Sequence, residues 1–251
     1  GIDKPDTRFG LELFDISDIV KTSAFKVFAN AIAQGGSVRG ICAPDGDKLS
    51  RKEIDAMEVV AKEYGAKGLA WVKLGIDGTV TGSAAKFIAA DELVKIKERA
   101  LAAPGSVLFF VADKNPVVFA ALARVRLALG RQFNLIDPDR TDVLWVLDFP
   151  LFEWSEDHKQ WQAMHHMFTS ARGPLPEVGS DLSPVIGDLY DLVMNGNEMG
   201  SGSIRINRPE IQQQIFDLVG ITREEADAKF GWFLRALEYG APPPRRSKRR
   251  R

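Results

Sequence analysis

The segment of residues 190–205, YDLVMNGNEMGSGSIR, most constrains how this chain can fold. It reads as two apolar strand segments interrupted by glycine, and it carries Asp191, Glu198 and Arg205 at equal seven-residue intervals. The pair Gly196-Asn197 predicts a two-residue hairpin loop that places Asn195 opposite Glu198. Because side chains alternate along a strand, Asp191 then lies on the same face of the sheet as Glu198.

Arg205 lies at an odd offset from Glu198 and would point to the other face in a regular strand. Gly200 and Gly202 are natural bulge positions that can return Arg205 to the face of the acids. Two converging carboxylates repel each other unless a cation lies between them, which suits a divalent metal that carries a polyphosphate. An arginine fork suits a carboxylate or phosphate of a substrate. Spacing alone leaves open an ordinary hairpin with a solvated polar face.

Five segments, taken in order, resemble the bacterial-type aspartyl-tRNA synthetases, which are class II enzymes. Together they extend the resemblance from about residue 1 to 243. It implies an α+β fold: part of the class II aminoacyl-tRNA synthetase antiparallel-sheet catalytic domain, with an inserted α/β GAD domain. The segments are DKPDTR at 3–8, GAKGLA at 65–70, WVLDFPLFE at 145–153, AMHHMFTS at 163–170 and DLVMNGNEMGSGSIR at 191–205.

The resemblance implies a role for four side chains. The acids that match Asp191 and Glu198 hold ATP and its Mg²⁺ in this family. The arginine that matches Arg205 binds the side-chain carboxylate of aspartate, and the histidine that matches His165 closes over aspartate. A rigid arginine fork selects aspartate over asparagine because the amide leaves a buried charge unpaired.

Three further positions carry expectations of their own. A histidine pair in a loop is more often surface polarity than a ligand, so the role of His166 stays open. Met167 replaces the proline usual in the family, from which we expect a less rigid loop. Asp148 ends an apolar strand segment, and we expect a buried, hydrogen-bonded acid with a structural role.

The reaction implied by the resemblance is that of an aspartate-tRNA ligase. Aspartate and ATP give aspartyl-adenylate and pyrophosphate, and the 3′ end of tRNA then takes the aspartyl group. The resemblance implies ATP and Mg²⁺ as cofactors, a homodimer in the complete enzyme and a cytoplasmic location, and it assigns no acid or base catalyst. The family's α-phosphate clamp and dimer-forming segments do not occur in this sequence, so we expect a piece of a longer protein that is inactive alone. A non-catalytic RNA- or protein-binding module derived from a synthetase is the alternative.

The resemblance divides the chain into four parts. Residues 1–15 match a catalytic-domain segment, 16–135 the GAD insertion domain, and 136–243 the aspartate and ATP/Mg side of the catalytic domain. Residues 244–251 form a basic tail that could contact RNA phosphates or remain a solvated, disordered tail.

Local signals predict the secondary structure of these parts. Ser50 and Glu53 predict a capping box for a helix that ends at Gly65. Asn207 is expected to cap a helix that begins near Pro209. Apolar patterns and a second capping box predict the other elements: strands at 69–72, 107–111 and 143–149, and helices at 90–102, 116–133 and from 222 to 240.

Composition limits the classes of function. The chain has 251 residues, 45% of them apolar, which is enough for a substantial core. Its 33 basic and 34 acidic residues nearly cancel, so contact with RNA must be local. The single Cys42 excludes an internal disulfide and fits a reducing compartment. No apolar run approaches membrane-spanning length, so we expect no membrane association, and no signal peptide opens the chain.

Overall fold

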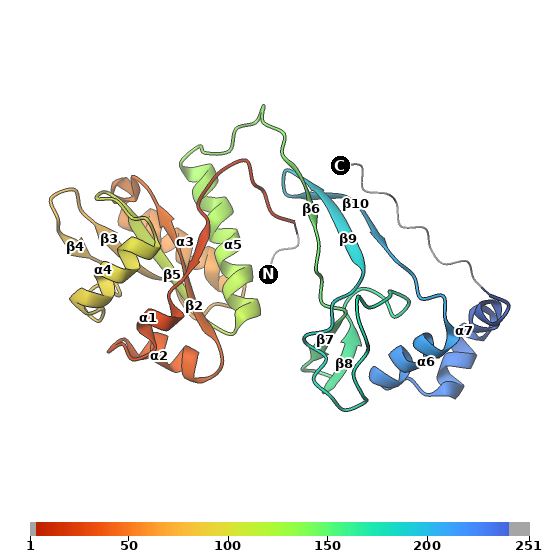
Figure 1. Cartoon of the computed structure of the whole chain (residues 1–251). Coiled ribbons are helices and arrows are strands. Elements are labelled where there is room, and N and C mark those ends of the chain that lie inside the picture. The colour runs from red at the N-terminus through yellow and green to blue at the C-terminus, as the bar shows by residue number, and fades with distance from the viewer. Residues whose placement is uncertain (1–3, 241–251) are drawn as a thin grey trace. The chain divides into compact units, whose positions relative to one another are not determined.

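The computed structural model describes residues 4–240. Contacts between Cα atoms divide the chain into two units, Gly1–Asp142 and Val143–Arg251. The N-terminal unit contains α1 to α5, and the C-terminal unit contains α6 and α7 (Figure 1). Both units combine antiparallel sheets with helices, so the chain is of mixed α+β class.

The N-terminal unit is built on a five-stranded sheet in the order β1-β2-β5-β3-β4. All of its pairings are antiparallel, whereas the term α/β implies parallel neighbours. The reason is the position of β5, which lies between β2 and β3 and runs opposite to both. The strands are β1 (Leu13–Asp15), β2 (Ser37–Ala43), β3 (Ala70–Leu74), β4 (Val80–Thr81) and β5 (Val107–Asp113).

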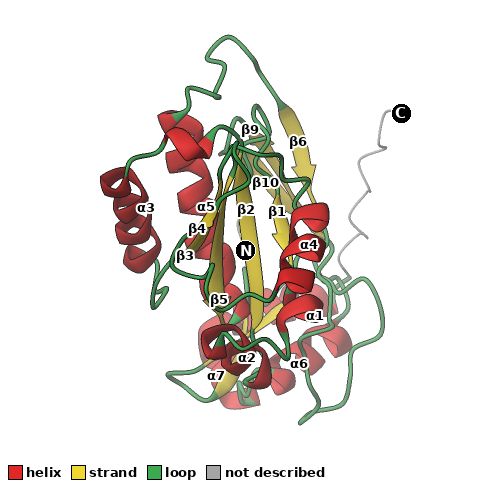
Figure 2. Cartoon of the chain, turned by 90° about the vertical axis from the view of Figure 1, so that its left-hand side faces the viewer, coloured by secondary structure: helices red, strands yellow, loops and turns green. Residues whose placement is uncertain are grey.

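Helices cover both faces of this sheet (Figure 2). One core lies against α3 (Arg51–Glu63) and α5 (Asn115–Gln132), and a second lies against α2 (Lys26–Ala33) and α4 (Ala90–Arg99). The short α1 (Ser17–Val20) and the 3₁₀ turn η1 (Gly46–Lys48) complete the unit. The predicted capping box of α3 is confirmed, because Ser50 accepts from the Glu53 amide and Glu53 accepts from the Ser50 amide.

The residues that precede the sheet are part of this unit. Phe9 and Leu11 lie in the core on the α5 side. The guanidinium of Arg126 donates to the carbonyl oxygens of Phe9 and Leu11 at 2.7 and 3.1 Å and lies 4.0 Å from the centre of the Phe9 ring. Residues 9–15 therefore contribute core side chains and an edge strand to the N-terminal unit. The insertion domain expected from the sequence begins only at residue 16.

The C-terminal unit contains a three-stranded sheet in the order β10-β9-β6 and a separate hairpin of β7 and β8. Its core is formed by Leu151, Phe152, Leu182, Val185 and residues of the helix region. The strands are β6 (Val143–Val146), β7 (Phe152–Ser155), β8 (Gln160–Ala163), β9 (Leu189–Met194) and β10 (Asn197–Ser203), and the helices are α6 (Pro209–Leu218) and α7 (Arg223–Glu238).

One helix start is predicted correctly and one is wrong. Thr222 and Glu225 form the expected capping box of α7. Asn207 does not cap α6, because Arg208 occupies the N-cap position and no side chain bonds to the first turn there. Pro209 begins this helix without an amide that needs a partner, so the capping residue is dispensable.

None of the helices between residues 4 and 240 combines the length and hydropathy that a bilayer-spanning helix needs.

Candidate functional site

The hairpin predicted from residues 190–205 forms between β9 and β10, but its loop lies one residue earlier than expected. Met194 pairs with Asn197, so the loop residues are Asn195 and Gly196. Both have a left-handed backbone, with φ of 50° and 78°. A type I′ turn requires this conformation at both positions, and Asn-Gly adopts it readily. The predicted Gly196-Asn197 loop is therefore wrong.

The two acids nevertheless share one face of the sheet. Glu198 pairs with Val193 instead of Asn195, and a two-residue step leaves a side chain on the same face. Asp191 is two residues from Val193 on β9, so it projects to that face as well. Asp191 is only 2% exposed, whereas Glu198 is exposed. One carboxylate therefore lies inside the unit and the other lies at its surface.

A single bulge brings the strand after Glu198 back into phase. The register shifts between Glu198 and Gly200, so that Ser201 pairs with Asp191. Side-chain alternation from Ser201 onward places Arg205 on the face of the two acids. The predicted bulge at Gly200 occurs, and no second bulge at Gly202 is needed.

A separate chain segment holds the backbone of Arg205. Arg205 forms an antiparallel bridge with Thr169, whose side chain is buried. The bridge thus joins Arg205 to the end of the loop of residues 164–168, here called the His165 loop. Backbone hydrogen bonds of 2.8 and 2.9 Å flank the bridge, from Ser170 to Ile204 and from Ile206 to Phe168.

The two histidines of the His165 loop have different surroundings. The exposed His165 ring meets the ring of Phe149 edge-on, with centroids 5.1 Å apart. His166 is partly buried, and its Nδ1 accepts from the Phe168 amide at 3.3 Å. Burial lowers the pKa of His166, and the positive charges of Arg205 and His165 lower it further. Both effects favour the neutral form of the His166 ring.

The acids have the donor chemistry of a magnesium site that a ligand completes. Between residues 4 and 240, no group of three or more His, Cys, Asp or Glu side chains is arranged to hold a metal ion. Proteins commonly bind Mg²⁺ through one or two carboxylates together with substrate phosphates. Asp191 and Glu198, with oxygen donors on one face, fit that arrangement.

Asp148 differs from the expectation of a buried acid. Its side chain is 70% exposed, and Arg172 Nη1 donates to its Oδ1. Strand β6 ends at Val146, and Asp148 has a left-handed φ of 62° that continues no strand. The end of the strand therefore turns this acid toward solvent, where Arg172 also approaches Asp188 at 3.5 Å.

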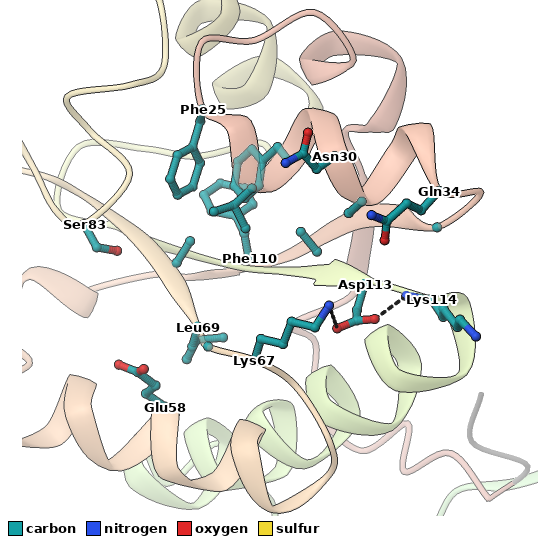
Figure 3. Close-up of a pocket in the computed structure, with 17 residues that line it drawn as sticks. Phe25, Asn30, Gln34, Glu58, Lys67, Leu69, Ser83, Phe110, Asp113 and Lys114 are labelled. Carbon is teal, nitrogen blue, oxygen red and sulfur yellow. Dashed lines mark hydrogen bonds and ion pairs between the residues drawn. The ribbon is translucent and has the colours of Figure 1, made fainter.

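The N-terminal unit holds a separate cleft of about 560 Å³ between α2 and the start of β3 (Figure 3). Phe28 and Phe110 are among the residues that line it. At its rim, Lys67 Nζ lies 3.9 Å from the carboxylate of Asp113. None of the four predicted site residues lines this cleft, so the aspartate and ATP proposals do not involve it.

One polar contact of the His165 loop was missed by sequence reasoning. Gln212 on α6 is completely buried and donates to the carbonyl oxygen of Met167 at 2.8 Å. The sequence carries no signal for this contact, since its acceptor is a main-chain atom 45 positions away.

Known proteins match this chain over most of its length. An aspartate-tRNA(Asp/Asn) ligase of Rubrobacter xylanophilus is 50% identical over 245 residues, which are 97% of this chain and 40% of the relative. An aspartate-tRNA ligase of Ruminiclostridium cellulolyticum is 47% identical over 244 residues, which are 97% of this chain and 41% of the relative. The chain thus spans about two fifths of the length of these curated relatives. The family model "tRNA synthetases class II (D, K and N)" matches residues 1–244, and the chain therefore belongs to this family.

Proposed function

We propose that this chain supplies the aspartate and ATP/Mg side of an aspartate-tRNA ligase. The observation that supports the proposal is the strand register, from which side-chain alternation assigns Asp191, Glu198 and Arg205 to one face of the β9-β10 hairpin. The backbone of Arg205 is joined to the end of the His165 loop. The membership in the class II (D, K and N) family and the names of the relatives support the choice of reaction.

In this proposal, Arg205 binds the side-chain carboxylate of aspartate. Its planar guanidinium can donate two parallel hydrogen bonds, which the neutral amide of asparagine cannot match. His165, whose side chain is exposed, closes over the bound amino acid. The lowered pKa of His166 favours its neutral form, so this ring leaves the binding of an anionic substrate to Arg205 in the proposal.

Asp191 and Glu198 would hold Mg²⁺ together with the phosphates of ATP. When bound, the ion neutralises phosphoryl charge during attack on the α-phosphorus. The buried Asp191 is fixed within β9, so its carboxylate needs little reordering before it binds. Positioning and charge stabilisation then promote formation of aspartyl-adenylate, and the 3′ end of tRNA takes the aspartyl group.

The proposed organisation keeps the parts expected from the sequence, although residues 9–15 also pack with the N-terminal unit. Residues 1–15 and 136–243 belong to the catalytic domain, 16–135 form the GAD insertion domain, and the complete enzyme is a homodimer. The antiparallel strands of the N-terminal unit and its two separate cores support an inserted module that can pack by itself. The basic tail of residues 244–251 lies outside the described residues.

A chimera tests the proposal. The matching 245-residue segment of the Rubrobacter ligase is replaced by this chain, and aspartate-dependent pyrophosphate exchange and tRNA aspartylation are measured. We expect both activities in the chimera and neither in the 251-residue chain alone. The unmodified ligase is the control, and circular dichroism checks that the chimera folds. A folded chimera that activates asparagine or lysine but not aspartate would overturn the proposal.

A further inference from the structure

Gln212 makes a contact that packing alone does not explain. Its side chain is completely buried on α6, and its Nε2 donates to the Met167 carbonyl oxygen at 2.8 Å. Its Oε1 is buried and has no hydrogen-bond partner among the described residues. An unpaired buried acceptor lowers stability, and a methionine of similar length would avoid that loss. The amide is therefore better explained by the one bond that it does make.

The orientation of the amide is fixed by this bond. If the amide were reversed, Oε1 would face the carbonyl oxygen of Met167, and two acceptors would repel each other. The bond requires Nε2 on the loop side, which leaves Oε1 as the unpaired atom. The Oε1 atom of Gln212 is thus left without a hydrogen bond, while Nε2 binds the main chain at Met167.

That point lies near the end of the His165 loop, one residue before Phe168. At the start of the loop, the Met164 amide donates to Leu151 at 3.0 Å, and at its end the Ile206 amide donates to Phe168 at 2.9 Å. The carbonyl of Met167 lies between these attachments and directly after His166. The Met167 side chain also packs against the core of the unit. Bonds within the chain segment, from the Phe168 and Thr169 amides to His166, also shape this stretch, and the contact with Gln212 adds a restraint from α6.

We infer that Gln212 is a positioning residue for aspartate binding, which acts through the backbone of Met167 to hold His165 and His166 beside Arg205. The inference rests on the proposed function, since it gives the loop its role in binding aspartate. In this inference the bond from Gln212 offsets part of the rigidity that the loop is expected to lose with Met167 in place of the proline usual in the family. Gln212 restrains the backbone from outside, whereas proline would restrain it from within.

The first test uses the 251-residue chain and does not depend on activity. Gln212→Met removes both polar atoms at nearly constant length, and Gln213→Met on the same helix removes only an exposed bond to Asp217. In Gln212→Met we expect amide hydrogen exchange in residues 164–168 to rise about three- to tenfold, the factor for losing one ordinary hydrogen bond. The NMR titration of His166 should also move toward its ordinary pKa. Exchange in β9 and α7 should stay unchanged, as should the whole loop in Gln213→Met.

The outcome separates a positioning role from a structural one. If exchange rose equally in the loop, β9 and α7, Gln212 would serve general stability and the inference would fail. Unchanged exchange in the loop would overturn it as well. Both readouts are independent of aspartate, so they judge the anchoring even if the proposed function is wrong.

The second test asks whether the anchoring serves aspartate. In the chimera with the Rubrobacter ligase, Gln212→Met should raise the KM for aspartate about three- to tenfold, while the KM for ATP and kcat stay near those of the parent. A loosened loop with an unchanged KM for aspartate would contradict the inference. A parent chimera that does not use aspartate at all would instead contradict the proposed function.

Discussion

Two acidic residues on one face of a sheet can do different work because their surroundings differ. The side chain of Asp191 on β9 is almost fully buried, whereas that of Glu198 on β10 is exposed to solvent. The buried carboxylate has little room to change its orientation, whereas the exposed carboxylate faces solvent. Substitution of Asp191 is therefore expected to affect folding and binding together, while substitution of Glu198 isolates the effect on binding.

The titration of His166 gives a prediction at the residue scale. Burial lowers its pKa below the ordinary 6.5, so the folded state binds a proton less readily than the unfolded state. The unfolded state therefore gains protons first as the pH falls, which lowers the free energy of unfolding. The full stability is present above about pH 6.5, and this part of it is lost as the pH falls through the lower pKa of His166 in the folded state. Urea unfolding of the C-terminal unit should show a free energy that falls between pH 7 and pH 5 (about two pH units around the His pKa).

His166→Gln should remove this part of the pH dependence, and the exposed His158→Gln serves as the matched control. Hydrogen bonds from Ser183 lower the pKa of Asp181 in the same unit, so this carboxylate contributes only at lower pH, near and below 3.8. If the free energy of unfolding changed with pH equally in the wild type and in His166→Gln, the pKa of His166 would not differ between the folded and unfolded states.

At the scale of secondary-structure elements, two helical glycines predict opposite effects of the same substitution. A Cβ at Gly130 of α5 would lie 2.7 Å from a ring carbon of Phe9, whereas one at Gly231 of α7 would meet nothing nearer than the tip of Arg235 at 3.4 Å. Alanine is favoured over glycine in a helix by about 1 kcal/mol. Gly231→Ala should therefore stabilise α7 by up to about 1 kcal/mol.

Gly130→Ala should destabilise the N-terminal unit by about 1–3 kcal/mol, since the added methyl group displaces Phe9 from the core. Native-state hydrogen exchange in α5 and in α7 measures the two effects separately. If both substitutions raised stability, Phe9 could move away from the added methyl group without lowering the stability of the N-terminal unit.

What the sequence predicts well at this scale is local. The capping boxes at Ser50 and Thr222 depend on residues three positions apart, and both are present. Strand β1 has only three residues and is defined by its pairing with β2, so no local pattern reveals it. The hairpin loop was misplaced by one residue because Asn195 and Gly196 compete with Gly196 and Asn197 as turn residues.

The residues of the site also fall into those that the sequence predicts and those that it does not. The acids and Arg205 were found from their spacing and from the family resemblance, and strand alternation then sets the shared face. Gln212 was missed because its partner is a main-chain carbonyl, which carries no residue-specific signal. Asp148 was expected inside because it follows apolar residues, but the strand ends two residues before it.

At the scale of the whole molecule, the extent of the N-terminal module is open to a direct test. The proposed boundary at residue 16 removes β1 and the buried Phe9 and Leu11. A fragment of residues 16–135 should fold but be less stable than one of residues 4–142 by about 3 kcal/mol or more, since burial of one large apolar side chain contributes roughly 1.5–3 kcal/mol. Arg126, which bonds to the removed backbone, would also lose its acceptors.

Urea unfolding of both fragments measures this difference. Equal stabilities would place the module boundary at residue 16 and make the preceding segment an attachment that the module does not need.

The measurement that bears most directly on the proposed site is steady-state pyrophosphate exchange by the chimera, with aspartate and ATP varied separately. Arg205→Lys keeps the charge but loses the two-donor fork, so the KM for aspartate should rise about ten- to hundredfold, the equivalent of roughly 1.5–3 kcal/mol, with little change for ATP. Glu198→Gln should weaken the use of ATP and Mg²⁺ and leave aspartate comparatively unaffected. If both substitutions raised only the requirement for ATP, Arg205 would not bind the carboxylate of aspartate.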